Sequence, residues 1–143
     1  PQLVSEVIGS GPVGHMAERI AAMVADSDRC GVVLVTAAEE MPVQEGIEML
    51  ANLEQHLGRC AEAVVVNGLY PSLPKDGVTR TGSTVDPAAE LWARRRTINE
   101  RELARLRRAW NGSLVTLPLL PVDPGPALVG ALARLLRRGL EAA

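Results

Sequence analysis

The stretch Gly31-Val-Val-Leu-Val-Thr36 decides the fold of this chain, because it is a short, β-branched run without polar alternation. Two runs of the same kind follow, Ala63-Val-Val-Val-Asn67 and Ser113-Leu-Val-Thr-Leu-Pro-Leu-Leu120. Continuous apolar runs are typical of strands that are covered on both faces, as in parallel sheets. The three runs therefore predict three buried, parallel strands.

The segments around these strands have the periodicity of helices, with apolar residues three or four positions apart. Pro42 suits the first turn of one such helix and Gly58 its C-terminal end. Asp86 and Pro87 can cap and start another, in which Leu91 is expected on the buried face. Helices are predicted, in chain order, over residues 2–8, 14–25, 42–58, 87–110 and 127–140.

The regular alternation of strand and helix predicts an α/β protein with three layers. The sheet should hold about three parallel strands, in the same order in space as in sequence, with helices on both faces. A length of 143 residues and a hydrophobic fraction of 47% suit a single domain, residues 1–143, with a core of its own.

Composition argues against several functional classes. Lys and Arg number 15 against 17 acidic residues, and aromatic residues are only 2% of the chain, so neither a basic field nor stacking platforms favour nucleic-acid binding. The apolar runs are far shorter than the ~20 residues of a membrane helix. Two cysteines are too few for a secreted disulfide scaffold. We expect a cytoplasmic protein without a membrane span.

Three glycines, Gly9, Gly11 and Gly14, have the G-x-G-x-x-G spacing of dinucleotide-binding loops. An alternative interpretation is therefore an NAD- or FAD-binding Rossmann module, which requires a strand over residues 3–8 beside the strand at 32–36. From Gly14 to Glu39, the acidic residue at the end of the next predicted strand, the spacing is 25 residues, longer than the ~20 of that motif. His15 and the other histidine have no third partner at ligand spacing, so no metal site is predicted.

Polar or turn-forming residues follow each predicted strand, at the edge where open parallel sheets bind ligands. Asn67 comes directly after Val-Val-Val, and its amide can pair with the N6 and N7 edge of adenine or simply end the strand in a turn. The helix that carries Arg94–Arg108 is basic; it is either a solvated face with internal ion pairs or a docking surface for an acidic protein partner or for phosphate. A stand-alone interaction domain is thus a further alternative.

Four segments in this order resemble the C-terminal half of the anion-transporting ATPases, the family of arsenical-pump and tail-anchored-protein targeting ATPases. They are Val35-Thr-Ala-Ala-Glu-Glu-Met-Pro-Val-Gln-Glu45, Ala63-Val-Val-Val-Asn67, Arg94–Leu106 and Leu117-Pro-Leu-Leu-Pro121. The resemblance covers nearly all of the chain from about residue 30. It implies half of a deviant-Walker P-loop NTPase fold, in a parent that hydrolyses ATP with Mg²⁺ and works as a dimer.

In this family, the half that the chain resembles contributes the nucleoside side of the ATP site. The resemblance implies nucleotide contacts at Glu39, Asn67, Pro118, Pro121, Val122 and Asp123. Two features depart from the family. Residues 68–90 hold no cysteine for a bridging zinc, and the last loop reads Val122-Asp-Pro-Gly-Pro126 instead of the usual acidic, glycine-bearing loop.

The chain begins at Pro1 without an initiator Met and has no G-x-x-x-x-G-K-[ST] loop, so we expect a piece of a longer ATPase. Phosphoryl transfer needs a phosphate-binding backbone, a lysine and a magnesium site. The 143 residues alone are therefore expected to be catalytically inactive. The edge of the strand at 32–35 should be open, which favours homo- or hetero-oligomers over cover by residues 1–25.

Overall fold

The computed structural model describes residues 11–72 and 86–142. The helix predicted over residues 2–8 lies outside the described residues, as does the strand that a Rossmann module would need there. The described elements are α2 Pro12–Ala25, β1 Val33–Ala37, α3 Glu40–Leu57, β2 Ala63–Leu69, α4 Pro87–Ala109, β3 Ser113–Pro118 and α5 Pro126–Glu141.

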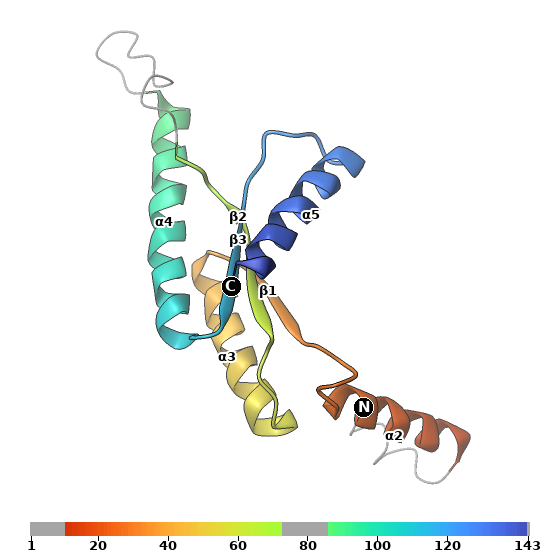
Figure 1. Ribbon diagram of the computed structural model, residues 1–143. Helices are drawn as coiled ribbons and strands as arrows, with labels where there is room; N and C mark the ends of the chain where they lie inside the picture. Colours follow the sequence, from red (N-terminus) through yellow and green to blue (C-terminus); the bar gives the residue numbers. More distant parts are fainter. Residues whose placement is uncertain (1–10, 73–85, 143) are drawn as a thin grey trace.

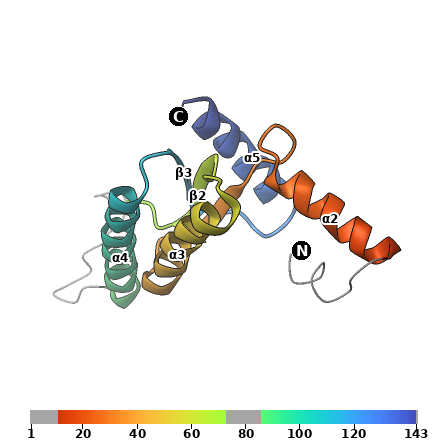
Figure 2. The ribbon, with the colours of Figure 1, turned by 90° about the horizontal axis from the view of Figure 1, so that it is seen from below.

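The three strands form one parallel sheet in the order β1-β2-β3, which confirms the predicted topology. Leu34 is paired with Val64, and Val65 with Val115. Helices α3 and α4 lie side by side on one face of the sheet, and α5 lies on the other (Figures 1 and 2). The three-layer α/β architecture expected from the sequence is thus present.

The helix ends follow from local chemistry. The Asp86 carboxylate accepts a hydrogen bond from the Ala88 backbone N–H at 2.9 Å and caps α4, while Pro87 starts it. Gly58 ends α3 in the left-handed conformation, with φ 59°. Both ends agree with the prediction.

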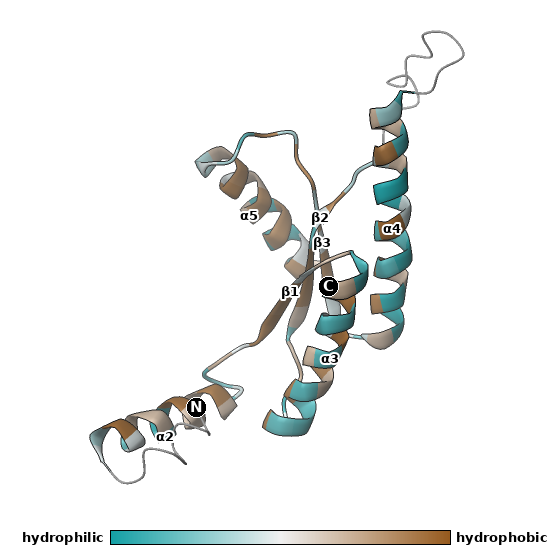
Figure 3. Ribbon diagram, turned by 180° about the vertical axis from the view of Figure 1, so that it is seen from behind, coloured by the Kyte–Doolittle hydropathy of each residue, from teal (hydrophilic) through white to brown (hydrophobic). Residues whose placement is uncertain are grey.

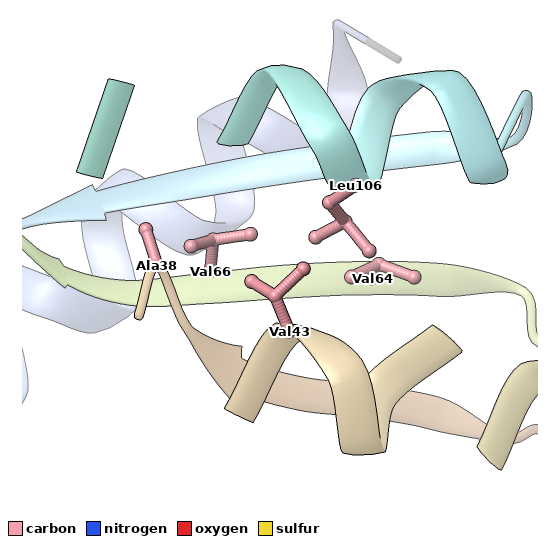
Figure 4. Packing of buried hydrophobic residues seen from close by; sticks show 5 residues of the cluster. All are labelled: Ala38, Val43, Val64, Val66 and Leu106. Carbon is pink, nitrogen blue, oxygen red and sulfur yellow. The ribbon is translucent and has the colours of Figure 1, made fainter. Parts of the chain in front are cut away.

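Two apolar clusters fill the space on either side of the sheet. The first lies between the sheet and helices α3 and α4 and consists of Ala38, Val43, Val64, Val66 and Leu106 (Figure 4). The second joins the opposite face to α5 through Val65, Val115 and Leu117, with Leu132, Leu135 and Leu136 of the helix packed on them. Because side chains alternate along a strand, neighbouring residues of β2 serve different clusters.

Two expectations about burial are wrong. One face of β1 is not covered, since Val33 is 50% and Val35 64% exposed: α5 packs over β3 and β2 and does not extend to β1. Leu91 is also exposed, although its spacing placed it on the inner face of α4. A helix of 23 residues is about 34 Å long, whereas the 6 residues of β3 span about 20 Å. The first turns of α4 therefore project beyond the sheet (Figure 1).

Two glycines of α5 give a matched test of its packing on the sheet. A Cβ at Gly139 would collide with Cγ1 of Val115 and would lie 3.2 Å from its Cγ2. A Cβ at Gly130 would meet only Arg134 Nη1, at 3.7 Å. We expect Gly139→Ala to lower the free energy of unfolding by about 1–3 kcal/mol. Gly130→Ala should raise it by roughly 0.5–1 kcal/mol through helix propensity. Urea unfolding of both variants checks the prediction, and equal effects would contradict it.

Candidate functional site

The carboxyl ends of the three strands meet at one edge of the sheet. Ala37 is paired with Asn67, and Leu69 with Pro118. The Leu119 backbone N–H also donates to the Leu69 carbonyl at 2.7 Å, which holds the ends of β2 and β3 together. This edge therefore places Glu39, two residues beyond Ala37, near the ends of the other two strands. Pro121, Val122 and Asp123 lie in the exposed loop between β3 and α5.

Asn67 lies where the sheet becomes irregular. The register between β2 and β3 shifts between Val66 and Leu69, and Gly68 has φ 73°, a conformation that favours glycine. Pairing with β1 continues as far as Asn67, so this residue follows Val65 on the α5 face of the sheet. Asn67 is exposed, and its amide can be reached from solvent. The sequence analysis did not foresee the irregularity, although a glycine after the asparagine was its signal.

Glu39 is the N-cap residue of α3, but its side chain does not cap the helix. Its carboxylate instead faces Arg95 of α4, with Oε1 and Nη1 at 3.5 Å. Both side chains are about half exposed, at 49% and 46%. An ion pair with this exposure contributes only ~0–1 kcal/mol. Glu39 therefore keeps a solvent-accessible carboxylate at the edge of the sheet where the strands end, next to a cationic group.

Asn99 of α4 is a residue of this edge that the sequence analysis missed. Its Nδ2 donates to the Ala38 carbonyl and its Oδ1 accepts from the Tyr70 backbone N–H, both at 2.8 Å. Asn99 is only 5% exposed. One amide therefore fixes the chain after β1 to the chain after β2, and it sets the positions of Glu39 and of the segment after Asn67. Its position in the sequence could have indicated this role, since Asn99 lies seven residues, or about two helical turns, before the buried Leu106 and therefore on the same face of α4.

The chain that leaves β2 is fastened to α4 at two further points. Trp92 Nε1 donates to the Pro71 carbonyl at 2.8 Å, and Arg96 Nη1 donates to the Tyr70 carbonyl at 3.2 Å. The Tyr70 and Trp92 rings are in edge contact, with centroids 4.8 Å apart. Two of the three aromatic residues of the chain thus stabilise the exit from β2.

Ion pairs neutralise much of the basic helix α4. Arg95 pairs with Glu39, and Arg96 with Glu100 at 2.8 Å. Glu102 is almost fully buried and receives two more arginines of α4, Arg101 and Arg105. The three other arginines of the predicted docking surface are exposed: Arg94, Arg107 and Arg108. The interpretation as a helix face with internal ion pairs therefore fits three of the seven arginines, because the partner of Arg95 lies outside α4.

The glycine motif runs directly into α2. Gly11 is the N-cap residue of this helix and Gly14 lies within its first turn. A dinucleotide motif also opens a helix, and the strand it needs before the glycines falls outside the described residues. Within residues 11–72 and 86–142, no group of three or more His, Cys, Asp or Glu side chains is placed to hold a metal ion. In the same residues, each helix is too short or too polar to span a bilayer.

The chain was also compared with known proteins. No protein-family model matches it, and the search of curated proteins finds no match either.

Proposed function

We propose that this chain is the nucleoside-side part of an ATPase of the anion-transporting type, and that it supplies adenine-side contacts and packing but not the catalytic loop. The observation that carries the proposal is the parallel order β1-β2-β3, which puts the segments after all three strands at one edge. Open parallel sheets bind ligands at this edge. The segments that resemble the family end at the same place.

The side chains at the edge suit a nucleoside. The exposed Asn67 amide offers one donor and one acceptor, the pair that matches N7 and N6 of adenine. The Glu39 carboxylate can accept hydrogen bonds from sugar hydroxyls. Pro118, together with the 121–123 loop, would form a wall beside the base. Phosphate binding and magnesium belong, in this proposal, to the P-loop half of the parent ATPase, in the cytoplasm.

A binding experiment tests the proposed role of Asn67. We expect the chain to bind adenosine more tightly than guanosine, and Asn67→Ala to weaken adenosine binding by roughly 5- to 100-fold, as for loss of one paired amide. Titration calorimetry measures both affinities. The matched control is Asn111→Ala, because Asn111 is exposed at the opposite end of β3. Equal affinity for both nucleosides, or an unchanged affinity of Asn67→Ala, would contradict the proposal.

A protein partner on α4 is a second, weaker proposal. It depends on the exposed arginines Arg94, Arg107 and Arg108, whose charges could meet an acidic surface.

A further inference from the structure

One side of α4 is bonded to the edge of the sheet where the strands end. Residues of a helix at positions i, i+3, i+4 and i+7 lie on the same side. Four residues with this spacing bond to the segments that follow β1 and β2: Trp92, Arg95, Arg96 and Asn99. Figure 3 shows that hydrophilic residues (teal) predominate on α4 and hydrophobic ones on the strands. Polar contacts therefore connect this part of α4 to the edge.

Two of these residues, one helical turn apart, hold consecutive residues of the segment after β1. The buried Asn99 donates through Nδ2 to the Ala38 carbonyl at 2.8 Å, which fixes the backbone directly before Glu39. Arg95 Nη1 lies 3.5 Å from Glu39 Oε1, which restricts the rotation of the glutamate side chain. Helix α4 therefore holds both the backbone at this point and the carboxylate that follows it.

The contact with Arg95 uses one oxygen of the Glu39 carboxylate. Within residues 11–72 and 86–142, the other oxygen, Oε2, accepts no hydrogen bond from the protein, and the side chain is 49% exposed. A carboxylate offers about four lone pairs to donors, so it can accept hydrogen bonds from two hydroxyl groups at once. The 2′- and 3′-hydroxyl groups of a ribose are two such donors on neighbouring carbon atoms, and carboxylates at the ends of parallel strands bind ribose hydroxyls in dinucleotide folds.

We propose that Glu39 binds the two neighbouring hydroxyl groups of a ribose, and that Arg95 is a positioning residue that holds the carboxylate ready for them. The inference rests on the proposed function and adds a substrate class to it, ribonucleosides as opposed to deoxyribonucleosides. The Asn67 amide reads the base and is indifferent to the sugar. A glutamate side chain that is already held loses less conformational freedom when the sugar binds, so Arg95 raises the affinity without touching the ligand.

A comparison of two nucleosides tests the role of Glu39. Adenosine carries both hydroxyl groups, whereas 2′,3′-dideoxyadenosine has the same base and neither hydroxyl. We expect the full chain to bind adenosine roughly 5- to 50-fold more tightly, as for hydrogen bonds to a charged group. Glu39→Gln should remove most of this preference. Titration followed by NMR measures both affinities, including weak ones.

The variants of Arg95 separate positioning from a general structural role. Arg95→Ala should weaken adenosine binding about two- to fivefold and leave the affinity for 2′,3′-dideoxyadenosine unchanged, because only the sugar contact depends on the held carboxylate. Arg95→Lys should restore most of the loss, and Arg95→Ala should have no further effect in a Glu39→Gln chain. The matched control is Arg94→Ala, which removes the same charge from the adjacent, exposed position and should change neither affinity.

Each other result would overturn the inference in a recognisable way. Equal affinities of the wild type for the two nucleosides, with Asn67→Ala still weakening both, would exclude the ribose contact and leave the proposed function intact. An equal loss of both nucleosides in Arg95→Ala would show a structural role, and tighter adenosine binding would show that Arg95 competes with the sugar. The absence of binding for either nucleoside would contradict the proposed function, and the inference with it.

Discussion

Replacement of Leu106 by alanine should lower the free energy of unfolding by about 2–5 kcal/mol, one of the two largest effects that we expect from a single substitution in this chain. Leu106 is fully buried and lies against Val43, Val64 and Val66, which come from α3 and β2 (Figure 4). Truncation removes three carbon atoms and leaves a cavity that the rigid sheet cannot close. The loss would be a large fraction of the ~5–15 kcal/mol that stabilises a domain.

The same helix provides the control. Leu91→Ala makes the identical chemical change in α4, at a residue that is 58% exposed. It should change the stability by no more than ~0.5 kcal/mol. Urea unfolding of the two variants, followed by circular dichroism, gives the comparison. Similar losses at both positions would mean that the core is not where the structure places it.

The strands and their order were predictable because their sequences are locally unambiguous. Val64, Val65 and Val66 are β-branched and almost fully buried, so a helix or a surface strand is a poor alternative for this run. The short strands alternate with amphipathic helices, which leaves few topologies other than a right-handed, parallel sheet. The two helix-end signals at Gly58 and Asp86 agreed with the periodicity, and both hold.

The open face of β1 was not predictable from its own residues. The sequence pattern predicts that Val33 and Val35 are buried. Such a pattern shows which residues favour burial, but it does not show whether another element of the fold covers them. This face of the sheet is covered by α5, which packs on Val65 and Val115 and does not extend to β1. Leu91 illustrates the same limit, since its exposure follows from the difference in length between α4 and the strands.

The location of the candidate site was predictable from the sequence, but most of the side-chain contacts within it were not. Glu39, Asn67 and Pro118 could be assigned to one edge, because the ends of parallel strands coincide there. The ion pair of Glu39 with Arg95 could not, since the two residues lie 56 positions apart in the chain. Asn99 is a polar residue in phase with a buried stripe, and only the structure shows which backbone groups it satisfies.

Replacement of Asn99 by aspartate tests whether its amide holds together the edge of the sheet where β1 and β2 end. Aspartate retains the acceptor for the Tyr70 N–H but has no donor for the Ala38 carbonyl, and it brings a charge into a site that is only 5% exposed. A buried carbonyl that loses its hydrogen-bond donor costs ~1–3 kcal/mol, and the cost is higher where a negatively charged group replaces the donor. We expect Asn99→Asp to lower the free energy of unfolding by about 2–4 kcal/mol at neutral pH.

The pH dependence of that loss separates the amide role from simple packing. Protonation of the new carboxyl group removes its charge and supplies a donor for the Ala38 carbonyl, so part of the lost stability should return as the pH falls toward 5. Asn52→Asp makes the same change at an exposed position of α3 and should have little effect at either pH. A loss at Asn99 equal to that at Asn52 would show that the bonds to Ala38 and Tyr70 do not hold the edge. A loss that does not depend on pH would contradict this explanation, because a carboxyl group and an amide fill nearly the same volume and differ here only in charge and in the donor to the Ala38 carbonyl.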